Sequence, residues 1–454
     1  MYVRKQLSLA AMALLLLSAG AALAQTAQDP LKAGFDNPPN GARPRVWWHW
    51  MNGNISKDGI KLDLEWMHRV GLGGFQNFDA ALATPQVVKQ RLVYMTPEWK
   101  DAFKYATTLA DQLGLEEAIA GSPGWSESGG PWVPASQGMK KYVWSETDVV
   151  GGQPFTGALA HPPENTGAFQ NVAIHDSLSA PEGSKPIPQF YADSVVLAYR
   201  RPVGDVSLES LHPKMSASGG SPDFAMLSDG DLQKPTKLPK PAEGQSSWIQ
   251  YEFEQPVAIR AVTIAGSDAT GFARMFAGKV DRSVEASDDG QSFHEVAKLE
   301  GGGSVEHTYS FPSATGKYFR VVFKQGPRPP LPPWMADMDT SSMGFGAMKP
   351  DLDYSISELV LHPGARVNLF EDKAAFSSEE DIYSLASPSY SSADAVAKSD
   401  VIDLTSKMHP DGTLDWTPSA GDWVVLRFGY SLLGIYNHPS TAEATGLEVD
   451  KLNS

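Results

Sequence analysis

Two carboxyl side chains late in the sequence have a spacing that suits acid–base chemistry. Glu448 and Asp450 are two residues apart, so an extended strand places both on the same face. Their neighbours Leu447 and Val449 are apolar and tend to exclude water, which raises the pKa of a carboxyl group and favours a role as proton donor. Glu448 is therefore our candidate general acid, and Asp450 is a candidate ligand for a polar substrate. An ion pair of Lys451 with one of the two acids is the competing interpretation.

Polar residues also follow two short apolar runs near the start of the chain. His49 and Asn52 lie at the end of the run 45–50, and Asp79 ends the run 74–79. Amide groups donate and accept hydrogen bonds, so they can hold ligand hydroxyls in both senses, and a carboxylate can hold hydroxyls or calcium. Structural roles compete with this interpretation, because Asn52 could shape a turn and Asp79 could cap the following segment.

The run Gly121–Trp132 is a loop that contains four glycines and two prolines. Such a loop brings backbone and an aromatic face close to a ligand, and loops at strand ends often carry function. Trp125 supplies the aromatic face and Glu127 supplies a carboxylate, so both are candidate binding residues. A structural clamp is the alternative.

The elements around these residues alternate between strands and helices. Helical spacing of apolar residues predicts helices over 56–70 and 97–113. Short apolar runs predict three strands, at 45–50, 74–79 and 115–120. This alternation predicts βαβ units and a parallel sheet, whose C-terminal loops carry the candidate residues.

The middle of the chain, from about residue 142 to residue 362, loses the helical period and shows short alternating runs typical of an all-β sandwich. The residues that carry a closer resemblance are Leu227–Leu232, Trp248, Tyr251, Val284–Gly290 and Phe293. With them, residues 205–363 resemble the discoidin-like, galactose-binding-like sandwich, for which we favour a structural role over glycan binding. The later run Trp423–Phe428 is continuous and apolar, as in a strand of a buried parallel sheet.

The first residues have the pattern of a secretory signal peptide. Arg4 and Lys5 precede the apolar stretch Leu7–Leu17, and Ala22–Ala24 is a small-residue cleavage site. This apolar stretch is shorter than the roughly 20 residues that a membrane-spanning helix needs. We expect removal of residues 1–24 and export to the periplasm or outside the cell, without a membrane anchor.

Composition narrows the class of ligand. The chain has no cysteine, which excludes thiolate metal sites and cysteine nucleophiles. Its formal net charge of −16 argues against nucleic acid and anionic membranes as partners. The 12 tryptophans mildly favour a glycan ligand, because their rings can stack on the apolar faces of sugars.

Four segments together identify a family resemblance. They are Trp47–Ile55, Gly73–Asp79, Gly124–Trp132 and Gly446–Lys451. In this order, with a β-sandwich between the third and the fourth, they resemble glycoside hydrolase family 106, the α-L-rhamnosidases. The resemblance runs from about residue 40 to the end of the sequence.

The resemblance implies a (β/α)₈ barrel that removes terminal α-L-rhamnose from plant or microbial glycans with inversion, and a calcium ion at the sugar site. Inversion needs two carboxyl groups about 6.5–9.5 Å apart. Glu448 takes the role of the acid, the base is expected beyond Ser454, and the calcium ligands stay unassigned.

The implied organisation begins with the first half of the barrel at 40–145. An inserted β domain follows at 146–365, and residues 366–454 form a connector and an incomplete return to the barrel. Since a closed barrel needs about 250 residues of its own, we expect a chain truncated at its C-terminal side.

Two other functions stay open. One is a non-catalytic glycan-binding protein in which the sandwich holds the sugar. The other, weaker one is a β-glycosidase of another barrel family, because acid–base pairs recur on such folds.

Overall fold

The computed structural model describes residues 29–452, apart from 83, 127, 171, 173–187, 243–244, 267–279, 301–303, 327–351, 378–382 and 384. The chain divides into two compact units. The first runs up to Pro131 and includes the later segment Asn437–Gly446, and the second holds most of the rest. The predicted signal peptide lies outside the described residues.

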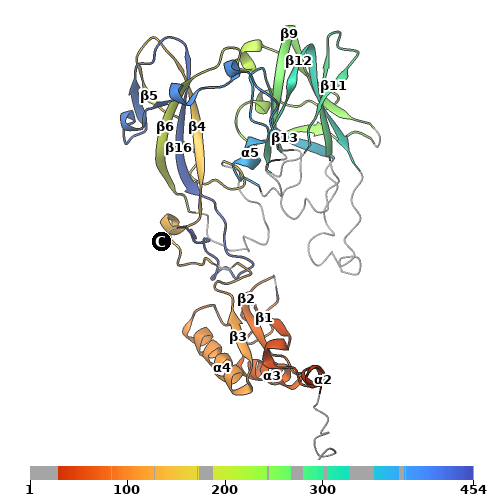
Figure 1. The fold of residues 1–454 in the computed structure, drawn as a ribbon, viewed down its shortest axis with the longest axis vertical. Coiled ribbons are helices and arrows are strands. Elements are labelled where there is room, and N and C mark those ends of the chain that lie inside the picture. The colour runs from red at the N-terminus through yellow and green to blue at the C-terminus, as the bar shows by residue number, and fades with distance from the viewer. Residues whose placement is uncertain are drawn as a thin grey trace, which may run out of the picture. The chain divides into compact units, whose positions relative to one another are not determined.

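Three parallel strands form the sheet of the first unit, in the order β1-β2-β3. The elements, visible in Figure 1, are β1 (Arg45–Met51), α3 (Lys57–Arg69), β2 (Gly74–Ala80), α4 (Pro97–Leu113) and β3 (Glu116–Ile119). The predicted alternation of strands and helices and the parallel pairing are confirmed. Ser56 caps α3 and Thr96 caps α4, each by accepting a hydrogen bond from a backbone N–H of the first turn.

A short additional helix, α2 (Pro30–Asp36), and the 3₁₀ turn η1 (Asn40–Ala42) precede the sheet. Asp29 accepts a hydrogen bond from the N–H of Leu31 and so caps α2. This helix buries no residue, so no apolar periodicity in the sequence could indicate it.

The two faces of the three-stranded sheet differ in what covers them. Trp48, Trp50 and Phe75 point to the side of α3 and α4 and pack in one apolar core with helix residues such as Leu64 and Trp99. Alternation along the strands puts His49 and Phe78 on the opposite face, where the two rings stack at 5.0 Å. The strand ends therefore present side chains to both faces of the sheet.

A seven-stranded antiparallel sheet forms the larger part of the second unit, in the order β11-β10-β12-β9-β13-β8, with β7 paired to β9. Its strands are β7 (Lys214–Ala217), β8 (Thr236–Pro239), β9 (Ser247–Gly266), β10 (Val280–Ser287), β11 (His294–Lys298), β12 (Glu306–Gln325) and β13 (Asp353–His362). The pairing of β9 with β12 shifts register midway, and a single apolar core fills the resulting sandwich. The antiparallel sandwich is confirmed, and its discoidin-like kinship stays a prediction.

A second antiparallel sheet of this unit has the order β14-β6-β16-β4. Its strands are β4 (Lys140–Val150), β6 (Tyr191–Arg200), β14 (Ile402–Asp403) and β16 (Asp422–Leu432), and a separate pair joins β5 (Phe155–Ala158) to β15 (Thr413–Trp416). The prediction of a parallel strand at Trp423–Phe428 is wrong, since β16 runs antiparallel to both β4 and β6. The strand β16 buries residues on both of its faces, and such an apolar run looks the same in a parallel and an antiparallel sheet.

Short elements complete the second unit. They are η2 (Ala135–Gln137), η3 (Glu209–Leu211), η4 (Phe224–Leu227), α5 (Phe370–Lys373), η9 (Ser392–Asp394), η10 (Lys398–Asp400) and η11 (Thr405–Lys407). The part of the chain that the structure describes contains three parallel strands and no closed barrel. No helix in this part is long and apolar enough to cross a membrane.

Candidate functional site

The C-terminal ends of β1 and β2 lie next to each other in the first unit, because their pairing sets His49 opposite Phe78 and Trp50 opposite Asp79. The loop that follows β3 reaches this edge, since the N–H of Gly124 donates to the carbonyl oxygen of Asp79 at 2.6 Å. Sequence candidates from three separate segments therefore meet at one edge of the sheet.

His49 and Trp125 hold each other in a defined orientation. The indole N–H of Trp125 donates to Nε2 of His49 at 3.0 Å, which requires that nitrogen to be unprotonated. Burial lowers the pKa of His49 and so favours the same neutral ring, with its proton on Nδ1. Trp125 remains 46% exposed, so part of its surface is open to a ligand. Nδ1 of His49 has no hydrogen-bond partner among the described residues and can donate to that ligand.

Asn52 organises the loop after β2. Its backbone is in the left-handed region at φ 52°, which Asn tolerates better than most residues. Its side-chain amide donates to the carbonyl oxygen of Thr84 at 2.6 Å and accepts from Nη1 of Arg91 at 3.2 Å. The structure therefore supports the turn-shaping role of Asn52, and one amide N–H is left for a ligand.

Asp79 is a buried carboxyl group at the end of β2, only 4% exposed. Its Oδ2 accepts a hydrogen bond from Nε1 of Trp99 on α4 at 2.8 Å, so it neither caps the next segment nor forms an Asx turn in the described contacts. Burial raises the pKa of Asp79 to about 7, although the Trp99 hydrogen bond and the charge of Arg91 both act in the opposite direction. Asp79 can therefore exchange a proton near neutral pH.

The segment Asn437–Gly446 packs against this edge from the far end of the chain. Nη2 of Arg91 forms an ion pair with Oε1 of Glu443 at 2.6 Å, and the N–H of Trp125 donates to the carbonyl oxygen of His438 at 2.8 Å. Gly124 has φ +88°, and a Cβ there would lie 2.5 Å from that carbonyl group, so the close approach requires glycine. Sequence reasoning missed Arg91, His438 and Glu443, because contacts between distant segments leave no local periodicity.

Glu448 and Asp450 belong to the second unit. Glu448 is only 6% exposed. Its Oε2 lies 3.9 Å from Nζ of Lys451, so the ion pair of the competing interpretation is present, at a long distance. Asp450 is partly buried, and its Oδ1 accepts the N–H of Leu452 at 3.0 Å. The backbone around Glu448 is extended and bridges to Gly138 through Val449.

The remaining candidates concern a metal ion. Glu127 lies outside the described residues. Within the described ranges, no group of three or more His, Cys, Asp or Glu side chains is close enough to hold a metal ion. The calcium ion that the family resemblance implies therefore stays a prediction, without assigned ligands.

Comparison with known proteins decides the family. Residues 36–454 match the family model described as alpha-L-rhamnosidase, glycoside hydrolase family 106. The chain belongs to this family. The family resemblance inferred from the four sequence segments is therefore confirmed.

Two relatives are much longer than the part that matches this chain. The structure of a rhamnosidase from Novosphingobium sp. PP1Y is similar with a TM-score of 0.74 and 41% identity, over 93% of this chain and 36% of that chain. A Formosa agariphila protein named "Putative beta-glucuronidase" is 38% identical over 144 residues, which are 32% of this chain and 12% of that protein. The chain thus spans about a third or less of the length of these two relatives.

Proposed function

We propose that this chain forms the sugar-binding edge of an exported α-L-rhamnosidase that removes terminal rhamnose from glycans. One observation supports this proposal most directly: Trp125, His49 and Asp79 meet at the C-terminal edge of the parallel sheet. The chain that carries this edge belongs to the rhamnosidase family. Parallel α/β folds bind their substrates at that edge of the sheet.

Each side chain has a role that follows from its contacts. Trp125 stacks its exposed face on the sugar ring, and His49 donates from Nδ1 to a sugar hydroxyl. Asp79 and Asn52 hold the edge through their hydrogen bonds with neighbouring segments, and Asn52 can offer one amide N–H. Because the neutral state of His49 is fixed by Trp125, this donor keeps its orientation across the neutral pH range.

Glu448 is proposed as the general acid, and Asp450 as an additional substrate ligand. In an inverting mechanism the acid protonates the leaving glycosidic oxygen while a second carboxylate deprotonates the attacking water. Glu448 is buried, and we assign no residue to the base. Calcium is a further proposal that rests on the family resemblance alone.

A substrate panel tests the reaction class. The protein that carries this chain is assayed with p-nitrophenyl α-L-rhamnoside and p-nitrophenyl β-D-glucuronide, and the first-formed anomer of the product is identified by proton NMR. We expect hydrolysis of the rhamnoside with initial release of β-L-rhamnose. Preference for the glucuronide, or release of the α-anomer, would reject the proposal, whereas binding without hydrolysis would favour the glycan-binding alternative.

A further inference from the structure

The first unit contains a buried amide side chain to which the proposed function gives no role. Asn437 is 0% exposed and forms three hydrogen bonds with backbone groups. Its Nδ2 donates to the carbonyl oxygens of Pro123 at 3.0 Å and of Ala444 at 3.1 Å, and its Oδ1 accepts the N–H of Gly446 at 2.7 Å. Both N–H groups of the amide therefore have a partner, as burial of an amide requires.

Two of these hydrogen bonds close the segment Asn437–Gly446 on itself. Ala444 and Gly446 lie seven and nine residues after Asn437, so the amide ties the start of the segment to its end. The backbone N–H of Asn437 strengthens this closure by donating to the carbonyl oxygen of Gly446 at 3.1 Å. The segment thus holds its shape through its own hydrogen bonds.

The third hydrogen bond joins this segment to the loop after β3, which carries Trp125. Pro123, whose carbonyl oxygen accepts from Asn437, lies two residues before Trp125. The next residue, His438, makes two further contacts with the loop: its N–H donates to Oγ of Ser126 at 3.1 Å, and its carbonyl oxygen accepts the N–H of Trp125 at 2.8 Å. Three hydrogen bonds therefore hold the loop at Trp125 and on both sides of it.

The two segments also approach each other too closely for a side chain at Gly446. A Cβ at this position would lie 1.9 Å from the carbonyl oxygen of Gly130, near the end of the same loop. The N–H of Gly446 is the group that Oδ1 of Asn437 accepts, so the amide also holds this close contact. All of these residues belong to the first unit.

We infer that Asn437 is a positioning residue for sugar binding, because it holds the loop after β3 in the arrangement in which Trp125 contacts the sugar. This inference rests on the proposed function, since Asn437 is buried and acts only through Trp125. Without the amide, the carbonyl groups of Pro123 and Ala444 lose a donor and the N–H of Gly446 loses its acceptor, so the loop becomes more mobile.

Hydrogen–deuterium exchange of the protein that carries this chain, followed by mass spectrometry, measures how firmly the loop is held. Asn437→Ala should accelerate exchange in peptides that cover residues 121–131 about tenfold, because these contacts then open more often. Peptides of α4 should exchange as in wild type, which verifies that the unit stays folded.

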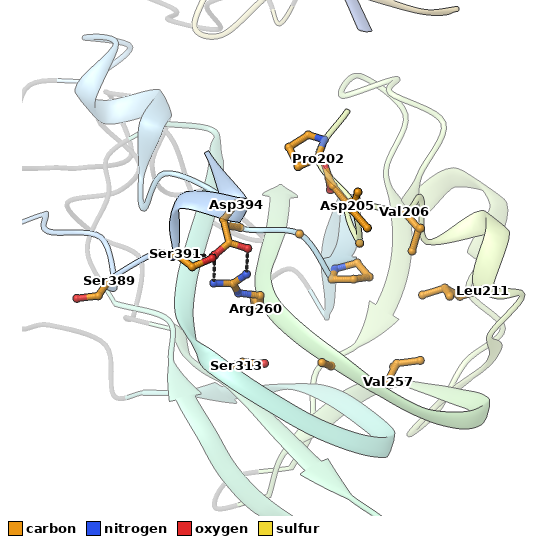
Figure 2. Close-up of a pocket in the computed structure, with 16 residues that line it drawn as sticks. Pro202, Asp205, Val206, Leu211, Val257, Arg260, Ser313, Ser389, Ser391 and Asp394 are labelled. Atoms are coloured by element: carbon orange, nitrogen blue, oxygen red, sulfur yellow. Dashed lines mark hydrogen bonds and ion pairs between the residues drawn. The ribbon is translucent and has the colours of Figure 1, made fainter. Parts of the chain in front are cut away.

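The matched control breaks a similar group of hydrogen bonds in the second unit. As Figure 2 shows, the carboxylate of Asp394 faces Arg260 and Ser391, and it accepts hydrogen bonds from both. Asp394→Ala removes these contacts and should leave the exchange of residues 121–131 unchanged.

Kinetics on p-nitrophenyl α-L-rhamnoside test whether the effect passes through Trp125. Asn437→Ala should raise KM about three- to tenfold and change kcat less than about twofold, because stacking on the sugar contributes equally to the ground state and the transition state. In the Trp125→Ala background, Asn437→Ala should raise KM no further, since the contact that it positions is already gone. Asp394→Ala should have wild-type KM.

Ser126→Ala is a milder variant of the same contact and keeps the inference testable if Asn437→Ala does not fold. It removes the acceptor of the His438 N–H and should change exchange and KM in the same direction, to a smaller extent.

Two results would overturn the inference in an active enzyme. One is wild-type exchange of residues 121–131 in the folded variants, and the other is an equal rise of KM with and without Trp125. Absence of hydrolysis by the wild-type protein would instead reject the proposed function, and with it the role of Asn437 in sugar binding, even if the exchange data showed that Asn437 holds the loop.

Discussion

The hydrogen bond between Trp125 and His49 is the contact on which substrate binding most depends in this account. It aims the open indole face and fixes the imidazole tautomer at the same time. Both residues were expected from the sequence, whereas their direct contact was not, since 76 residues separate them along the chain. Their side chains act as one binding element.

Replacing Trp125 tests that element. Trp125→Ala removes the stacking face and should lower kcat/KM for an aryl rhamnoside about tenfold or more. Trp125→Phe keeps a ring but removes the N–H that holds His49. Its kcat/KM should lie between those of wild type and Trp125→Ala. Trp66→Ala, an exposed tryptophan of α3, is the matched control and should have wild-type kinetics. Equal activity of all three variants would contradict the stacking role.

Asp79 should make the stability of the protein depend on pH. Burial raises its pKa from the ordinary 3.8 to about 7 in the folded protein. The contribution of Asp79 to the unfolding free energy is therefore fully present below pH 3.8 and is lost as the pH rises through about 7. The unfolding free energy of Asp79→Asn should therefore match that of wild type near pH 4 and exceed it by on the order of 4 kcal/mol above pH 8. Chemical denaturation at both pH values measures this.

The control for Asp79 is Asp111→Asn, a change at an exposed position of α4. In Asp111→Asn, the unfolding free energy should change between the two pH values by the same amount as in wild type. If the unfolding free energies of wild type and Asp79→Asn declined equally as the pH rises, Asp79 would be ionised at both pH values. It would then not exchange a proton near neutral pH.

The packing of β2 against β3 leaves no room for a side chain at Gly74. A Cβ at this position would lie 2.2 Å from the carbonyl oxygen of Glu116. Gly74→Ala should therefore push the two strands apart and lower the unfolding free energy by about 1–3 kcal/mol in urea denaturation. Gly41→Ala meets no atom within 4 Å and is the control in the same unit. A neutral Gly74→Ala would show that the strands are not so closely paired.

The elements that the sequence predicts well are those with a strong period and clear caps. The helices α3 and α4 and all three parallel strands follow from apolar spacing, Ser56, Thr96 and Gly114. β16 was misassigned because a buried run has no period that distinguishes parallel from antiparallel pairing. The ion pair of Arg91 with Glu443 spans 352 residues, and no local signal in a single sequence encodes such a contact.

The whole chain carries a further prediction about its first residues. We expect a signal peptidase to cleave after Ala24, so that the exported protein begins at Gln25. N-terminal mass spectrometry of the secreted or periplasmic fraction measures this directly. Ala22→Asp should leave an uncleaved precursor because the cleavage site requires small residues, whereas Gln25→Ala should be processed normally. An intact Met1 in an exported protein would refute the prediction.

At the scale of the molecule, one carboxyl group is proposed to donate the proton. Glu448, which belongs to the second unit, is this proposed proton donor. The sequence pattern Gly446–Lys451 predicts this residue, which is 6% exposed in the structure. The account depends on this acid more than on any other single residue.

The most direct test compares Glu448→Gln with wild type on two rhamnosides that differ in their need for an acid. A methylumbelliferyl leaving group needs protonation, whereas a 2,4-dinitrophenyl group departs without it. We predict that Glu448→Gln loses about 10²–10⁴-fold in kcat/KM on the first substrate and less than about tenfold on the second. Equal losses on both substrates, or wild-type rates on both, would show that Glu448 is not the general acid.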